Sequence, residues 1–268
     1  MIIDFHTHVF PDKIASATID LLAKNANIPA YSNGTLDGLV SKMKEGGVDI
    51  SIALPVVTKP TNFDSIINFA KALNERFEET HVLSFAGIHP KCENIPEKMR
   101  FIKTLGFKGI KIHPDYQGEF IDSAGYIEIV RQAKELDLIV VTHAGFDAGY
   151  PGQPIRCTPQ RALNLLSKIG GYDKLVFAHM GGNELYDDVY NILAGQNVYL
   201  DTSYVLSSIP KDKFNAILEK HGTDKILFAT DHPWQDAKEN IAIIKDYIQD
   251  NGALEKIFFK NAQKLLSL

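Results

Sequence analysis

The chain has 268 residues, 45% of them hydrophobic and 23% charged, a balance typical of globular proteins rather than disordered or fibrous ones. Its 28 basic and 33 acidic residues give a formal charge of −5 without a basic cluster, so we do not expect nucleic acid as a partner. No apolar run approaches the roughly 20 residues needed to cross a bilayer, so we expect no membrane insertion.

The two cysteines, Cys92 and Cys157, are far apart and form no CxxC pair. A disulfide framework or a cysteine-based zinc site is therefore not expected, and a reducing cytoplasm fits this usage. The N-terminal residues lack the basic segment and long apolar stretch of a secretory signal. The expected location is the cytoplasm.

Short segments rich in Ile, Val, Leu and Phe recur along the chain and are predicted to be strands. In chain order they are 2–6, 50–56, 82–88, 108–113, 138–143, 174–179, 197–203 and 225–231. Most are nearly continuous apolar runs, which favours parallel strands covered on both faces over half-exposed antiparallel strands.

Amphipathic segments lie between these strands. Residues 64–80, 125–136 and 211–222 have apolar side chains at helical spacing, and 253–268 is predicted to be a closing helix. Successive strand starts are far enough apart for one crossover helix each. The pattern predicts a single (β/α)8 TIM-barrel domain over residues 1–268, with a doubly wound open sheet as the structural alternative.

Polar residues stand at the C-terminal ends of the predicted strands, where barrel active sites lie. They are His6, His8, Lys111, His113, His143, His179, Asp201, Asp231, His232 and Trp234. Since side chains alternate along a strand, His6 and His8 share one face, as do Lys111 and His113. Imidazoles with one carboxylate suit Zn²⁺ or a similar divalent ion that keeps one position open for water.

Other polar residues have a less direct relation to such a site. His81 and His221 precede strands, so we expect them at the opposite end of the barrel in structural roles. His89 either lines the rim or turns the chain, and His232 is expected to point away from Asp231. Asp4 and Asp201 are candidates to support a ligand by hydrogen bonding.

Five motifs in order, "DFHTH", "GIKIHP", "THAG", "AHMGG" and "ATDHP", make the chain resemble the amidohydrolase superfamily. The nearest branch is the amidohydrolase-2 type, which also holds aminocarboxymuconate-semialdehyde decarboxylase. The resemblance implies a distorted barrel with one catalytic divalent ion, Zn²⁺ or another such as Mn²⁺. By motif, the implied metal ligands are His6, His8, His143 and Asp231.

The resemblance also implies roles beside the metal. His179 would act as an acid/base or as a further ligand, and Asp231 would both bind metal and take a proton. Lys111 would either be carboxylated and bridge two ions or, as we expect, stay charged and bind a substrate carboxylate. The Gly- and Pro-rich segment 144–160 is a candidate substrate loop in which Arg156 could hold a carboxylate.

The expected function is hydrolysis of a small carboxylated or cyclic substrate by a metal-activated water. The substrate-binding candidates are Lys111, His113, Arg156 and Trp234. The alternative is a metal-dependent decarboxylase, because the same ligands and acid/base groups serve both reactions. A barrel that binds metal or ligand without chemistry is a weaker alternative. A homodimer is compatible with the sequence, although no pattern specifies it.

Overall fold

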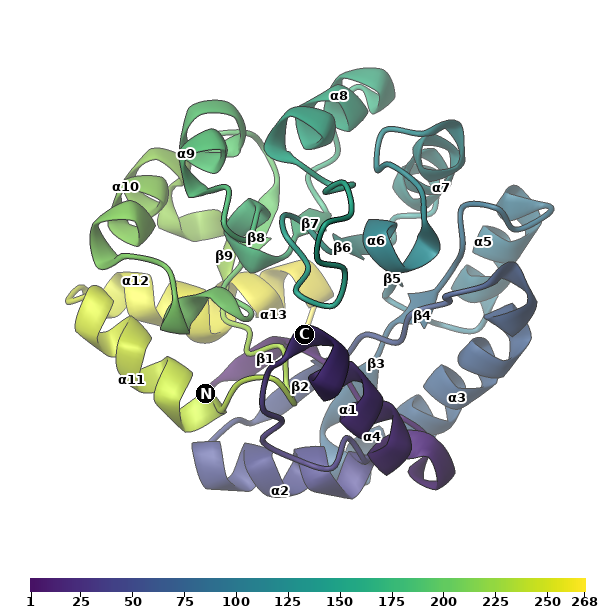
Figure 1. Cartoon of the computed structure of the whole chain (residues 1–268), viewed down its shortest axis with the longest axis horizontal. Coiled ribbons are helices and arrows are strands. Elements are labelled where there is room, and N and C mark those ends of the chain that lie inside the picture. The colour runs from purple at the N-terminus through teal and green to yellow at the C-terminus, as the bar shows by residue number, and fades with distance from the viewer.

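A computed structural model describes residues 1–268 and shows helices arranged around a set of central strands (Figure 1). The strands are β1 (Ile3–Thr7), β2 (Ile50–Ala53), β3 (Val82–Ser84), β4 (Ala86–Gly87), β5 (Gly109–Ile112), β6 (Ile139–Thr142), β7 (Leu175–Phe177), β8 (Tyr199–Asp201) and β9 (Ile226–Leu227). Every pair of neighbouring strands is parallel. The predicted parallel α/β architecture is therefore confirmed.

The strands close into a barrel although their ladders form two sheets, β1-β2-β3 and β4 to β9 in order. On one side the sheets meet at Phe85, which lies between β3 and β4 and donates its backbone N–H to the carbonyl of Ala53 at 3.0 Å. On the other side the N–H of Phe5 donates to the carbonyl of Phe228 at 2.9 Å. The N–H of Asp231 donates to His6 at 2.8 Å, which brings the last strand beside the first.

The prediction of one continuous strand over 82–88 was wrong, because the strand breaks at Phe85. That ring is fully buried and packs edge-on against Phe5, with 5.9 Å between the ring centroids. Gly109 makes room for it, since a Cβ atom there would overlap the Phe85 ring. Packing inside the barrel therefore interrupts the regular ladder at this point.

The longer helices cover the outside of the strands. They are α1 (Asp12–Ala26), α2 (Leu36–Gly46), α3 (Phe63–Glu75), α5 (Ile95–Thr104), α7 (Ala124–Glu135), α8 (Pro159–Ile169), α10 (Lys211–His221) and α11 (Ala237–Tyr247). Side-chain oxygens of Thr35, Thr158 and Asp236 accept backbone N–H groups at the starts of α2, α8 and α11. None of the helices combines the length and apolar character that crossing a membrane requires.

Shorter helical segments complete the connections: α4 (Phe77–Thr80), α6 (Pro114–Gln117), α9 (Tyr186–Asp188), α12 (Asn251–Glu255) and α13 (Asn261–Leu266). Single turns or wider π-type turns are η1 (Pro60–Asn62), η2 (His179–Gly181), η3 (Val189–Leu193), η4 (Val205–Ser207), η5 (Thr223–Lys225) and η6 (Lys256–Lys260). Two predicted helices are consequently subdivided. Residues 64–80 form α3 and α4 with a break at Arg76, and the closing helix runs through α12, η6 and α13.

Three clusters of buried apolar side chains stabilise the barrel. The largest has 50 residues, many of them between the strands and the outer helices, and an inner cluster of 14 includes Phe5, Phe85, Val141 and Val176. A third, of eight residues, includes Leu39 and Met43 of α2. Burial of this apolar surface is the main favourable contribution to folding. The inner cluster gives way to polar side chains at the C-terminal ends of the strands, and this change defines the floor of the site.

Candidate metal centre and active site

His6, His8 and Asp231 bring three potential metal-binding atoms together at one end of the barrel. The Nε2 atoms of His6 and His8 are 3.2 Å apart. Asp231 Oδ1 lies 3.3 Å from the first and 3.1 Å from the second. His6 belongs to β1, His8 follows it, and Asp231 follows β9, so parallel pairing across the closure creates the cluster.

The donor chemistry of the His6–His8–Asp231 cluster fits a divalent cation. His6 Nδ1 lies 3.0 Å from Asp201 Oδ2, and His8 Nδ1 lies 3.1 Å from the carbonyl oxygen of Leu54. Both partners are acceptors, so each Nδ1 carries the proton in a neutral ring and each Nε2 presents a lone pair. Two lone pairs and a carboxylate oxygen then converge, which is the arrangement that Zn²⁺ and Mn²⁺ accept.

The electrostatics of the cluster favour the same protonation states. Burial, with the charge of Lys111, lowers the pKa of His6 to about 3, so its ring is neutral at pH 7. Burial alone would raise the pKa of Asp231, but charge and hydrogen-bond contributions from His6 and His8 outweigh it and hold that pKa below its usual range. The cluster therefore offers the neutral imidazole of His6 and the ionised carboxylate of Asp231.

Lys111 in β5 is fully buried, and its Nζ lies 2.9 Å from His6 Nε2. Burial lowers the pKa of this ammonium to about 8, against the opposing effect of Asp231 and Asp201. A buried cation at the cavity floor is a natural counter-charge for a ligand carboxylate, whose binding would offset its desolvation.

The backbone is strained at two residues of the site, Asp231 and His179. Asp231 has a φ of 67° and His179 a φ of 60°, in the left-handed region that side chains other than glycine rarely adopt. Such conformations persist only where the surrounding structure imposes them, and they cluster at functional sites. Here they occur at two residues that the sequence singled out as catalytic candidates.

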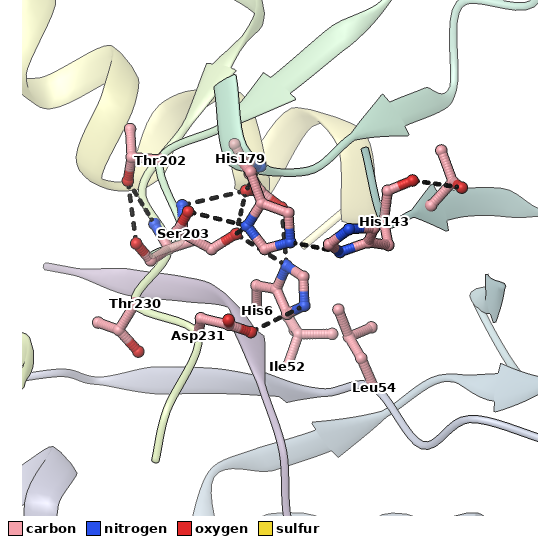
Figure 2. A network of polar contacts seen from close by, with 12 residues as sticks. His6, Ile52, Leu54, His143, His179, Thr202, Ser203, Thr230 and Asp231 are labelled. Atoms are coloured by element: carbon pink, nitrogen blue, oxygen red, sulfur yellow. Dashed lines mark hydrogen bonds and ion pairs between the residues drawn. The ribbon is translucent and has the colours of Figure 1, made fainter. Parts of the chain in front are cut away.

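A hydrogen-bonded network joins the histidines behind the cluster (Figure 2). His179 Nε2 lies 2.9 Å from His143 Nδ1, and His179 Nδ1 lies 2.9 Å from the carbonyl oxygen of Ser203. The Ser203 hydroxyl lies 3.1 Å from His6 Nδ1 and donates to Asp201 Oδ1. Asp201 and Ser203 thus orient both His6 and His179.

His143 lies beside a second group of polar atoms rather than within the first. Potential ligand atoms of His113, His143 and Asp147 all fall within 4.8 Å of one another. The rings of His113 and His143 stack with centroids 4.3 Å apart. Hence His6, His8 and Asp231, three of the four predicted metal ligands, come together, whereas the ring of His143 is turned toward His179 and this second group.

Both groups open into one cavity of about 670 Å³. Half of its 32 lining residues are hydrophobic, so the cavity combines an apolar wall with the polar groups of the two clusters. The predicted residues Lys111, His113, His179 and Trp234 line it, and α1 contributes Ile14 and Leu22.

Other polar residues from the sequence lie away from the cavity. Arg156 does not line the cavity. Its guanidinium lies 3.5 Å from the carboxylate of Asp115, which balances its positive charge. His232 faces Ser32 at 2.8 Å, so it points away from the cluster as expected. His89 accepts the N–H of Lys91 at 3.0 Å and turns the chain.

Several residues of the site were not predicted individually. Asp147, Tyr116 and Tyr150 line the cavity, and Ser203 joins the histidine network. Asp147 and Tyr150 belong to segment 144–160, the candidate substrate loop, but strand periodicity does not specify which residues of a loop face a cavity. Ser203 had a signal of its own, because it lies two residues after Asp201, at the spacing of one strand face. Tyr116, in the short helix α6, had none.

Comparisons with known proteins identify the family and the fold. A family model described as amidohydrolase matches residues 3–268. No curated protein matches the chain. Among solved structures, a dihydroxybenzoic acid decarboxylase from a Polaromonas species, with bound manganese and the inhibitor 2-nitroresorcinol, is 19% identical with a TM-score of 0.71; the match covers 100% of this chain and 97% of the other.

Two further solved structures have the same architecture. A protein from Acinetobacter baumannii described as "probable 2-pyrone-4,6-dicarboxylic acid hydrolase" is 16% identical over 100% of this chain and 99% of the other, with a TM-score of 0.69. A TIM-barrel protein from Bordetella bronchiseptica is 17% identical over 99% and 98%, with a TM-score of 0.75. At such identities these structures support the barrel fold and no more.

Proposed function

We propose, since the chain belongs to the amidohydrolase family, that it is a metal-dependent hydrolase of a small carboxylated or cyclic substrate. The observation that carries the proposal is the convergence of His6 Nε2, His8 Nε2 and Asp231 Oδ1 at the floor of the cavity. A divalent ion among these three atoms would offset their mutual repulsion, which supports the proposal.

In this proposal one divalent ion, Zn²⁺ or Mn²⁺, is held by His6, His8 and Asp231. His143 remains a proposed fourth ligand, although in the structure its Nδ1 faces His179. The resemblance to a decarboxylase with bound manganese supports a divalent ion of this kind. When bound, the ion would lower the pKa of water to about 7 and polarise a substrate carbonyl.

The side chains around the ion would position the substrate and move protons. His179 lines the cavity and would exchange a proton with the substrate or the leaving group, through the Nε2 atom that contacts His143. Asp231 would accept a proton from the attacking water. Lys111 would bind a substrate carboxylate, and Trp234 and the apolar wall would exclude water.

Decarboxylation is the second candidate reaction. The fold likeness to a dihydroxybenzoic acid decarboxylase supports it, because the same acid/base group could protonate a substrate carbon as CO2 leaves. Lys111, buried beside the cluster, would hold the carboxylate in either reaction.

We further propose that residues 1–268 act as one catalytic domain that can form a homodimer, which light scattering of the purified chain would test. Cys92 and Cys157 are free and buried, which is compatible with the proposed cytoplasmic location.

The test combines metal analysis with a substrate panel. Elemental analysis should find one divalent ion per chain, and His6→Ala or Asp231→Ala should lose metal and turnover together. His81→Ala, at a residue outside the cavity lining, is the matched control and should keep both. CO2 release against ester or ring opening, over small carboxylated cyclic compounds, separates the two reactions. Full metal content and activity in either cluster variant would refute the site.

A further inference from the structure

Asp147 is a second acidic residue in the cavity wall, and it comes from a different part of the chain than the metal cluster. It comes from the loop between β6 and α8, and it and Asp231 are the two acidic residues among the cavity lining. Its side chain is 12% exposed. Because Asp147 lines the cavity, this carboxylate is accessible to a ligand while mostly shielded from bulk water.

The two oxygens of Asp147 have different surroundings. Oδ1 accepts the N–H of Gly149 at 2.7 Å, which fixes the carboxylate on its own loop. The contact recorded for Oδ2 is His113 Nε2, at the long distance of 3.5 Å. A carboxylate oxygen can accept two hydrogen bonds, so Oδ2 keeps acceptor capacity toward the cavity.

The tautomer of His113 indicates that this group binds a hydrogen-bond donor rather than a second metal ion. His113 Nδ1 accepts the N–H of Tyr116 at 3.4 Å, so in a neutral ring the proton is on Nε2, the atom that faces Asp147. A protonated Nε2 cannot ligate a metal. It faces the carboxylate instead, and the ring is held between Tyr116 and His143 at centroid distances of 4.0 and 4.3 Å.

Aromatic side chains surround this carboxylate. Phe146, Tyr116 and Tyr150 line the same cavity, and the two tyrosine rings are 5.3 Å apart. Burial raises the pKa of both tyrosines, and the charge of Asp147 raises it further. Planar apolar walls beside a carboxylate suit a flat ligand that carries a polar hydrogen.

We propose that Asp147, held by the N–H of Gly149 and lying beside His113, forms a donor-binding subsite that recognises a hydroxyl or amino group on the substrate. The inference rests on the proposed function, since it adds a second recognition point to the same cavity. The substrate class becomes a small cyclic carboxylic acid, with its acid group toward Lys111 and the metal cluster and a hydroxyl or amino group toward Asp147.

The test is a calorimetric binding series on the Zn²⁺-loaded chain. The probes are the ortho, meta and para isomers of hydroxybenzoate and aminobenzoate, each compared with the methylbenzoate of the same geometry, which lacks the donor. A hydrogen bond to a charged acceptor corresponds to roughly tenfold or more in affinity. At least one donor-bearing isomer should therefore bind about tenfold more tightly than its methyl counterpart.

Asp147→Ala, which removes both donor and acceptor, should bring that ratio to near one while retaining the fold, as judged by circular dichroism. Asp147→Asn should remove the ratio for the amino isomers, since its carbonyl end accepts the N–H of Gly149 and leaves an NH2 group toward the cavity. Thr58→Val, elsewhere on the cavity wall, is the control and should keep the ratio. The subsite is refuted if no donor-bearing isomer binds, if every ratio in the wild type is near one, or if the ratio survives in Asp147→Ala. A second Zn²⁺ per chain that disappears in Asp147→Asn would also overturn it in favour of a metal.

Chelation of Zn²⁺ separates this proposal from the proposed function. If the metal cluster binds the acid group, every benzoate should lose affinity on chelation while the donor ratio persists. If chelation leaves all affinities unchanged but the ratio depends on Asp147, the proposed metal chemistry fails and the donor-binding subsite stands.

Discussion

Replacing Asp201 by asparagine should weaken metal binding without removing a metal ligand. Asp201 is completely buried, and its Oδ2 lies 3.0 Å from His6 Nδ1. Its Oδ1 accepts the backbone N–H groups of His179 at 2.9 Å and Ser203 at 3.0 Å. The carboxylate accepts hydrogen bonds at both oxygens. An asparagine amide can accept at only one end, because its other end, the NH2 group, is a donor.

The structure decides which way the amide turns. If the amide nitrogen replaced Oδ1, two buried N–H groups would lose their acceptor, at about 1–3 kcal/mol each. The carbonyl end should therefore face His179 and Ser203, leaving the NH2 group against His6 Nδ1. His6 must then carry its proton on Nε2, the atom that faces His8 and Asp231. The ring is thus held in the tautomer that cannot bind metal.

The expected loss of metal affinity is about 10–100-fold, the usual effect of removing a partner that orients a ligand. That range corresponds to about 1.4–2.7 kcal/mol. Competition with a chromophoric chelator measures it for Zn²⁺ and Mn²⁺, with circular dichroism to confirm the fold. Asp122→Asn, whose carboxylate pairs with Arg161 away from the cavity lining, is the control and should bind metal normally. Unchanged affinity in a folded Asp201→Asn variant would refute the tautomer argument.

Three further predictions concern the same end of the barrel. His179→Gln should retain metal by elemental analysis but lose about 10²–10⁴-fold in turnover, and normal turnover would exclude its acid/base role. In metal-free protein the buried Lys111 has a pKa of about 8 rather than 10.5, so between these pH values the unfolded chain binds more protons than the folded one. The free energy of unfolding of the wild type should therefore rise with pH relative to that of Lys111→Met, by up to about 3 kcal/mol over this range. Urea titrations at several pH values measure the difference, and a difference that does not change with pH would contradict the prediction. Gly145→Ala should lower the free energy of unfolding by about 2 kcal/mol or more, because φ is +88° and a Cβ atom there would overlap the backbone of Asn183. Gly152→Ala is the control, since its φ is +76° but a Cβ atom there would meet open space, and it should destabilise the chain less. Equal effects of the two substitutions would show that the overlap at Gly145 is relieved.

Local patterns determined much of the fold in advance. Nearly continuous apolar runs predict parallel strands with both faces covered, and the closed parallel barrel confirmed this. The same local rule placed His6 and His8 on one face, since side chains alternate along a strand, and their Nε2 atoms are 3.2 Å apart. Asp231 could be associated with them because the last strand of a closed barrel lies beside the first.

Features that depend on side-chain packing could not be predicted in this way. The break at Phe85 results from a ring that packs against Phe5 inside the barrel, far away in the chain. Arg156 was a candidate for substrate binding, but the course of its loop places it beside Asp115. Neither contact has a periodic signal in the sequence, because each depends on how distant segments meet.

The sequence by itself determined that this chain forms a barrel with a cluster of potential metal ligands at the C-terminal ends of its strands. It did so because strand alternation and strand order are properties of the chain that need few distant contacts to express. Only the tertiary structure decided that the ring of His143 turns toward His179 and that Asp147 enters the cavity wall. Ring orientation and loop course are set by hydrogen-bond partners from other strands, which exist only once the barrel has closed.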